Sequence, residues 1–241
     1  LALVGDIDAE VALEKVRQYF EPIPRQADPP AVDLTELPQT EERRASYDDP
    51  LARLARIDVA YHIPESLTAD HDALSVLATI LSSGRSSRLY QAIVRDTQLG
   101  VNVGAFAVSN RGPSLFRLVG IAAPGADIGA LETAIYNQIE RIKVEPVEDW
   151  ELAKARNGAR RSFVASLGSS LQRAIILSRY ALFYDDPSLI NSRAERVGAV
   201  SAEDLRRVAS TYLIETNRSV IITVPKPASA PMDQVPGQEN F

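Results

Sequence analysis

The chain has 241 residues, which is enough for one large hydrophobic core or two smaller ones. Its 45% hydrophobic and 24% charged residues are ordinary for a globular protein, and its net charge of −6 argues against binding of nucleic acid, which requires a basic face. The absence of cysteine excludes disulfides and thiolate zinc sites, and no apolar run is long enough to span a membrane.

The first segment of the chain predicts a strand over 1–4, followed by an amphipathic helix that ends near Phe20. Asp8 caps this helix, and its apolar side is expected to be buried. Six prolines follow and predict a linker over 22–50, because proline neither continues a helix nor donates in a sheet. We assign residues 1–21 to the end of a preceding half-unit whose other strands lie upstream. Without these partners, the segment is expected to be mobile or to pair with another copy of the chain.

Residues 51–225 predict a complete α+β domain. Its predicted strands span 53–63, 100–109, 114–123 and 219–224, the middle two joined as a hairpin. Its predicted helices span 68–81, 128–142, 147–184, 187–197 and 202–213, and the longest is interrupted at 167–169. This pattern indicates an antiparallel sheet that is covered by helices on one face. A Pro-rich tail over 226–241 is predicted to be disordered.

The most informative motif lies in residues 81–103. A helix ends, a Gly/Ser loop follows, and a new helix begins at Ser86 or Ser87, whose hydroxyl groups can accept from free N–H groups of its first turn. Gly84 and Gly100 lie at the two ends of this second helix, where the backbone can require a positive φ.

This motif resembles the second half of the pitrilysin/insulinase-type zinc peptidases, the M16 family. There, a Gly/Ser loop is followed by Ser-Arg-Leu-Tyr or Ser-Arg-Leu-Phe, and then by an Arg and a Tyr seven residues apart. Residues 87–90 of this chain read Ser-Arg-Leu-Tyr, whereas the Arg and Tyr positions hold Val94 and Val101. The strand and helix of 1–20 and the strand of 56–64 also resemble the family, so the resemblance covers most of the chain.

The resemblance implies a non-catalytic C-terminal domain of a bacterial zinc endopeptidase. Such a domain forms the second half of a clam-like shell around an unfolded peptide, and a homologous subunit is a further expected partner. The family's Arg and Tyr donate hydrogen bonds to the substrate carbonyl as it becomes an oxyanion, which the side chains of Val94 and Val101 cannot do. In the family the Gly/Ser loop borders the substrate chamber, so the candidate peptide contacts are Gly84, Arg85, Ser86 and Ser87.

Zinc is not expected in this chain. The family's zinc ligands come from His-x-x-Glu-His on a helix and a downstream Glu, but the only histidines are His62 in a predicted strand and His71 near a helix start. We interpret both as ordinary, partly exposed imidazoles, and we expect zinc in the N-terminal half or in a partner. The expected location is the bacterial periplasm or cell envelope, with the cytoplasm as the alternative.

Other polar groups have structural interpretations. Arg95 lies one position after Val94. A shift of one residue turns a side chain about 100° around a helix, so Arg95 is expected to be a surface residue and not a donor. Glu148 and Asp149 fall where the long helix begins, and acids in a first turn stabilise the positive helix N-terminus. A basic helical patch is either a solvated face or a surface for a partner or an acidic peptide, and it comprises Arg156, Arg160 and Arg161.

Two alternatives to a peptidase domain remain open. The parent protein could be a scaffold of the same fold that is inactive in both halves, and the presence or absence of His-x-x-Glu-His upstream discriminates between the two. An unrelated peptide- or ligand-binding module would instead require a deep apolar pocket within this chain alone.

Overall fold

The computed structural model describes residues 1–30 and 32–226. Its strands are β1 (Arg43–Asp49), β2 (Arg56–Ile63), β3 (Gly100–Ala107), β4 (Ser114–Ala122) and β5 (Arg218–Pro225). They form one sheet in the order β1-β5-β2-β4-β3. Three of the four neighbouring pairs are antiparallel, as predicted, whereas β1 runs parallel to β5.

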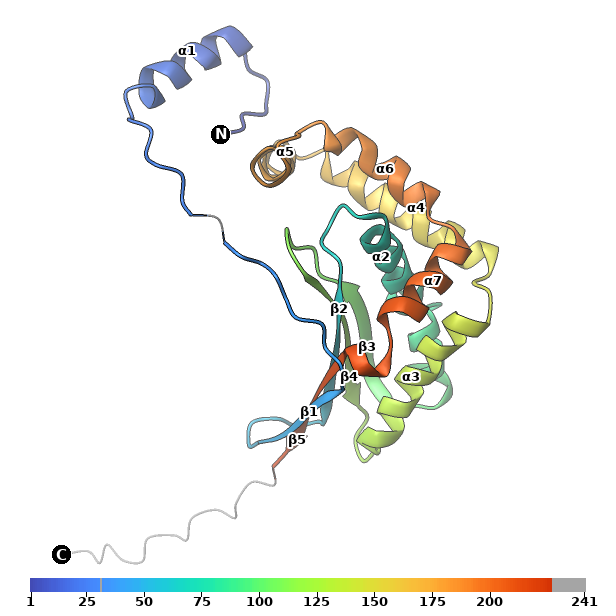
Figure 1. Cartoon of the computed structure of the whole chain (residues 1–241). Coiled ribbons are helices and arrows are strands. Elements are labelled where there is room, and N and C mark those ends of the chain that lie inside the picture. The colour runs from blue at the N-terminus through green and yellow to red at the C-terminus, as the bar shows by residue number, and fades with distance from the viewer. Residues whose placement is uncertain (31, 227–241) are drawn as a thin grey trace, which may run out of the picture.

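The helices other than α1 lie on one face of this sheet, which confirms the predicted α+β class (Figure 1). They are α1 (Ala9–Phe20), α2 (Ala69–Ser82), α3 (Ile128–Val144), α4 (Asp149–Ser166), α5 (Ser170–Tyr184), α6 (Leu189–Ala199) and α7 (Ala202–Tyr212), with a π-helix η1 (Tyr90–Asp96) and a 3₁₀ turn η2 (Glu215–Asn217). α2, α3 and α7 pack on the sheet, and α4 and α6 pack over α2. No helix among the described residues has the length and apolar character needed to cross a bilayer.

The core lies between the sheet and the first helical layer. Ile57, Val59 and Tyr61 of β2 are buried at every second position, because side chains alternate between the two faces of a strand. α2 is buried on most of its sides, since it lies between the sheet and the α4–α6 layer. α3 instead buries one stripe, in agreement with the predicted period, and this stripe comprises Leu131, Ile135, Ile139 and Ile142.

Short polar side chains set where several helices begin. Asp127 accepts hydrogen bonds from the N–H groups of residues 129 and 130 at the start of α3, as the sequence predicts. Ser169 caps α5 and thereby separates it from α4 at the predicted interruption. Ser201 and Asp204 form a reciprocal capping box at the start of α7.

The N-terminal segment differs from its prediction. Asp8 caps α1 as expected, but residues 1–4 form no strand. The helix has no buried residue, and Leu13 and Phe20 are exposed, because α1 lies apart from the sheet and its helices (Figure 1). Self-pairing or mobility of this segment stays a prediction.

β1 lies within the stretch assigned to a linker and was not predicted as a strand. Its sequence is mostly polar and largely exposed, so no apolar alternation marks it. Pairing with β5 creates the strand, and Gln39 extends the contact by donating to the Arg218 carbonyl oxygen at 2.6 Å. The division into 1–21, 22–50 and 51–225 stays a prediction, and the tail predicted over 226–241 lies, apart from Lys226, outside the described residues.

Gly84 has the positive φ predicted for it, at 77°, but Gly100 does not. Gly100 is needed for a different reason, which is close packing. A Cβ there would lie 2.9 Å from the Ile93 side chain and 3.1 Å from the Ile121 carbonyl oxygen. Gly100 therefore allows η1 and β4 to approach the start of β3.

We expect Gly100→Ala to lower the free energy of unfolding by about 1–3 kcal/mol, because the added methyl group overpacks this contact. Gly104→Ala on the same strand is the matched control, since its Cβ would meet its nearest neighbour, Phe106, at 4.0 Å. Urea unfolding followed by circular dichroism measures both changes. An equal effect of the two substitutions would contradict the packing argument.

Candidate functional site

The Gly/Ser loop of the sequence motif folds back on itself. Gly84, Arg85 and Ser86 are exposed, whereas the Ser87 residue is only 2% exposed. The Ser87 hydroxyl donates to the Gly84 carbonyl oxygen at 2.7 Å, and the Ser86 hydroxyl accepts from Lys154 at 2.7 Å. Neither hydroxyl accepts from an N–H group of the following turn in the described structure, which differs from the expected helix cap.

Arg88 of the motif forms a buried, bidentate ion pair with Glu151. Its Nε and Nη2 atoms donate to the two carboxylate oxygens at 2.8 and 2.6 Å. The side chains of Arg88 and Glu151 are 11% and 8% exposed. Burial alone would raise the pKa of Glu151, but hydrogen bonds from Arg88 and from the Glu148 N–H outweigh it and hold that pKa below its usual value. The motif arginine therefore joins the start of η1 to the start of α4.

The predicted role of the acids near residue 148 is confirmed, with one addition. Glu148 occupies the N-cap position of α4 and Asp149 begins its first turn. The residue that makes the long-range contact is Glu151, which the sequence did not single out. Because Glu151 lies far from Arg88 in the sequence, no local pattern indicates that the two side chains pair.

Val94 and Val101 lie on η1 and β3, two elements that pack against each other. Val94 is half-buried against the core, and Val101 is 49% exposed beside a bulge in β3. η1 is a π-helix, a conformation that is common at functional sites, and not the expected α-helix. Arg95 is exposed and paired with Asp96 at 2.7 Å, as expected of a surface residue.

The two histidines lie in unrelated environments. His71 is buried, which corrects the prediction of partial exposure, and its Nε2 atom lies 2.8 Å from the Val108 carbonyl oxygen. His62 is half-buried, with its Nδ1 atom 3.0 Å from a Glu36 carboxylate oxygen. Within 1–30 and 32–226, no three side chains of metal-binding type come together. The described residues therefore do not fit a zinc site.

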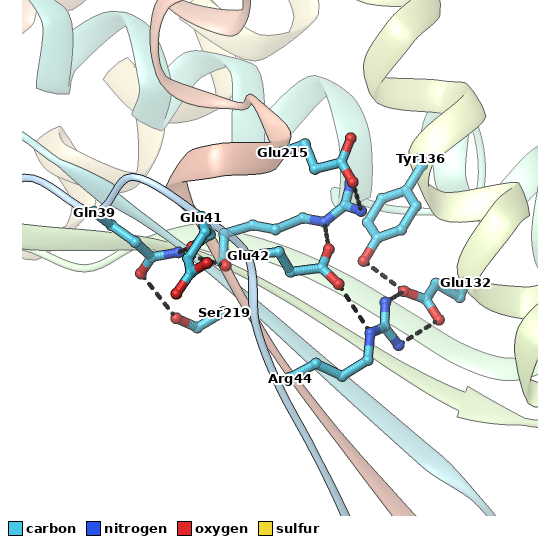
Figure 2. Close-up of polar contacts among 9 residues, drawn as sticks. Gln39, Glu41, Glu42, Arg44, Glu132, Tyr136, Glu215 and Ser219 are labelled. Carbon is cyan, nitrogen blue, oxygen red and sulfur yellow. Dashed lines mark hydrogen bonds and ion pairs between the residues drawn. The ribbon is translucent and has the colours of Figure 1, made fainter.

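A second polar cluster joins β1, β5 and α3 (Figure 2). Arg44 donates to Glu42 at 2.9 Å and to Glu132, which also accepts from the Tyr136 hydroxyl at 2.7 Å. Arg218 pairs with Glu42 and lies 4.2 Å from the centre of the Tyr136 ring. Burial alone would raise the pKa of Glu132, but Arg44 and Tyr136 outweigh it and lower that pKa. Both carboxylates face an arginine and stay ionised, so the cluster is a structural tie and not an acid–base site.

A cleft of about 990 Å³ lies among α2, α4, α5 and α6. Arg160 and Arg161 of the predicted basic patch line it, whereas Arg156 is half-buried and donates to the Val200 carbonyl oxygen. The predicted patch therefore divides into one structural arginine and two arginines that face the cleft. The cleft is lined by both polar and apolar residues, and its rim includes Ser83 but not the loop of residues 84–87.

Comparison with known proteins identifies relatives of this fold. A family model described as the peptidase M16 inactive domain matches residues 1–159. The zinc protease PqqE of Helicobacter pylori is 24% identical over 226 residues, which are 92% of this chain and 50% of that protein. The crystal structure of a protease from Helicobacter pylori has a TM-score of 0.85 at 23% identity and is matched over 92% of this chain and 54% of its own.

A smaller solved structure is matched over nearly all of its own length. The inactive peptidase domain of a Bordetella parapertussis protein has a TM-score of 0.66 at 26% identity, and it is matched over 74% of this chain and 95% of its own. The chain thus spans about half the length of the Helicobacter proteins that it matches.

We expect Glu151→Gln to cost about 3–5 kcal/mol of unfolding free energy at pH 7, because it leaves Arg88 buried without a counter-charge. Glu203→Gln is the matched control: that side chain is 69% exposed, and its ion pair with Arg206 is screened by water, so we expect little change. The lowered pKa of Glu151 means that its stabilisation is present above the unfolded pKa of about 4.3 and is lost as the pH falls through the folded value. The difference between the wild type and Glu151→Gln should therefore shrink below about pH 4, and urea titrations at several pH values measure it. A difference that grows on acidification would refute this assignment.

We expect the purified chain to hold far less than one zinc ion per molecule, because His62 and His71 are engaged elsewhere and no other imidazole or thiolate ligand exists. Metal analysis after dialysis against a weak chelator measures the ratio. One tightly held zinc ion per chain would contradict the prediction.

Proposed function

The chain belongs to the peptidase M16 inactive-domain family, and from this premise we propose that it encloses and positions a peptide for a zinc endopeptidase whose metal is carried elsewhere. The observation that carries the proposal is the motif of residues 87–90, followed by valines in the two donor positions. The Ser-Arg-Leu-Tyr motif supports the fold of one half of an M16 peptidase. With valine at both donor positions, this half has no oxyanion donor of its own there. The domain then contributes shape and contacts to hydrolysis, but no catalytic residue.

The geometry around the two valines supports this division of labour. A zinc ion bound in another half or subunit would supply the Lewis acid and the activated water. Val94 is packed against the core and Val101 is partly exposed. Because a valine side chain has no N–H or O–H group, neither residue can donate to a substrate carbonyl. In this proposal the two positions therefore leave the oxyanion without the stabilisation that the family's donors give.

The Gly/Ser loop is the proposed peptide contact. Gly84, Arg85 and Ser86 are accessible, and the buried hydroxyl of Ser87 holds the loop in place through the Gly84 carbonyl. A loop that is preorganised in this way loses little conformational entropy when a peptide binds. We therefore assign direct contact to the first three residues and a positioning role to Ser87.

The partners in this proposal are an N-terminal half-unit, a homologous subunit and the peptide. The exposed apolar side of α1, with Leu13 and Phe20, is the surface proposed for the N-terminal half. We place the enzyme in the bacterial periplasm or cell envelope, which cell fractionation would test.

A scaffold role without any peptidase activity is the second candidate. The same observation favours it, since a scaffold also needs no oxyanion donors at Val94 and Val101. The two functions differ in the upstream sequence: His-x-x-Glu-His supports the peptidase, and its absence supports the scaffold.

We expect the double substitution Val94→Arg with Val101→Tyr, in the complete zinc-containing enzyme, to raise kcat about tenfold or more, because two oxyanion donors are restored. Each single substitution should do much less, since both donors act on one oxyanion. Initial rates on an unfolded peptide measure the effect.

The swapped pair, Val94→Tyr with Val101→Arg, is the control, because it has the same composition and charge at the same positions. Thermal unfolding must show that each variant is folded, since Val94 is half-buried. If the swapped pair accelerates hydrolysis as much as the family pair, the assignment of these positions is wrong.

A further inference from the structure

The cleft among α2, α4, α5 and α6 concentrates positive charge. Its lining includes one arginine from the turn between β3 and β4, two from α4, one from α5 and one from α6, and these are Arg111, Arg160, Arg161, Arg179 and Arg193. The whole chain carries a net charge of −6. A cleft whose charge is positive in a chain of negative net charge is typical of a site that attracts an anionic ligand.

These five arginines have no ion-pair partner among the described residues. The acid in the lining, Asp72, does not neutralise them, because its Oδ2 atom accepts from Arg196 Nε at 3.0 Å. Arg88, by contrast, is buried and paired with a carboxylate. The cleft therefore gathers five exposed guanidinium groups that no carboxylate of the described residues neutralises.

Apolar side chains lie between these charges. Ile175 and Phe183 of α5 line the cleft and are exposed. Phe163 of α4 lies under the Arg193 guanidinium, 5.6 Å from its carbon to the ring centre. A matching ligand must therefore carry apolar groups as well as negative charge.

The wall formed by α5 is held in place. The Tyr184 hydroxyl lies 2.6 Å from the Ser66 hydroxyl, which joins the end of α5 to the loop before α2. Tyr180 packs edge-on against Tyr184, with ring centres 6.2 Å apart. Arg179 is therefore carried by a wall that needs little rearrangement to receive a ligand.

We propose that this cleft binds a peptide segment in which acidic and apolar residues alternate, an inference that rests on the proposed function and gives its substrate a chemical class. The guanidinium group pairs with a carboxylate through two parallel hydrogen bonds, and clusters of arginine recognise acidic motifs in this way. Nucleic acid is the less favoured anion, because the net charge of −6 repels a polyanion outside the cleft.

The test is fluorescence anisotropy of labelled peptides with the 241-residue chain, which needs neither zinc nor hydrolysis. A peptide of about 12 residues that alternates Glu with Leu should bind at least about tenfold more tightly than the same peptide with Gln in place of Glu. Raising the salt from about 0.05 M to about 0.5 M should weaken this binding, because partly exposed charges are screened.

Substitutions then locate the site. Arg179→Gln together with Arg160→Gln should weaken binding of the Glu peptide about tenfold or more, since both charges face the cleft. Arg173→Gln is the matched control, because Arg173 is exposed on the same helix α5 but does not line the cleft. Its binding should stay within about twofold of the wild type.

Three results would overturn the inference: equal affinity for the Glu and Gln peptides, equal loss of affinity in Arg173→Gln, or tighter binding of a single-stranded oligonucleotide than of the Glu peptide. Because none of these measurements depends on catalysis, they separate this inference from the proposed function. Absence of activity in the complete enzyme would count against the proposed function and leave the binding result standing.

Discussion

Burial of a single face of the sheet is the constraint on which the rest of this structure depends. Ile57 and Val59 of β2 point into the core, whereas Asp58, between them, belongs to the opposite face and pairs there with Arg56 and Arg117. A slip of one residue in register would exchange the two faces, so the burial pattern holds the strands in place. That register sets the position of β3 and, through the close contact at Gly100, the position of η1 as well.

Arginines perform two physically different tasks in this fold. Arg88, Arg44 and Arg218 each bind a carboxylate from a distant segment, and these pairs tie η1 to α4 and β1 to α3 and β5. The arginines of the cleft come from four separate places in the chain and have no such partner in the described part of it. What sets the cleft arginines apart is that they are gathered around one cavity without a carboxylate to neutralise them, whereas the three structural arginines are neutralised by carboxylates.

The proposed lack of oxyanion donors at positions 94 and 101 is compatible with the presence of the Ser-Arg-Leu-Tyr motif at 87–90. Ser87 and Arg88 belong to the motif on which the family resemblance rests, and in this chain they stabilise the loop and the start of α4. Their roles are therefore independent of the residues at positions 94 and 101. The contacts that hold the loop and the start of α4 therefore do not require an Arg or a Tyr at positions 94 and 101.

Sequence patterns alone determined the α+β class, the β3–β4 hairpin, the interruption between α4 and α5 and the cap of α1, because each depends on residues a few positions apart. They also supplied the family motif and the proposal that Val94 and Val101 occupy the positions of its donors. Only the tertiary structure decided that polar β1 is a strand, since its order comes from pairing with β5 at the other end of the domain. The same holds for the Arg88–Glu151 pair and for the cleft, whose residues meet only after the chain has folded. Local patterns encode local structure, whereas contacts between distant segments depend on topology and packing, which no short stretch of sequence contains.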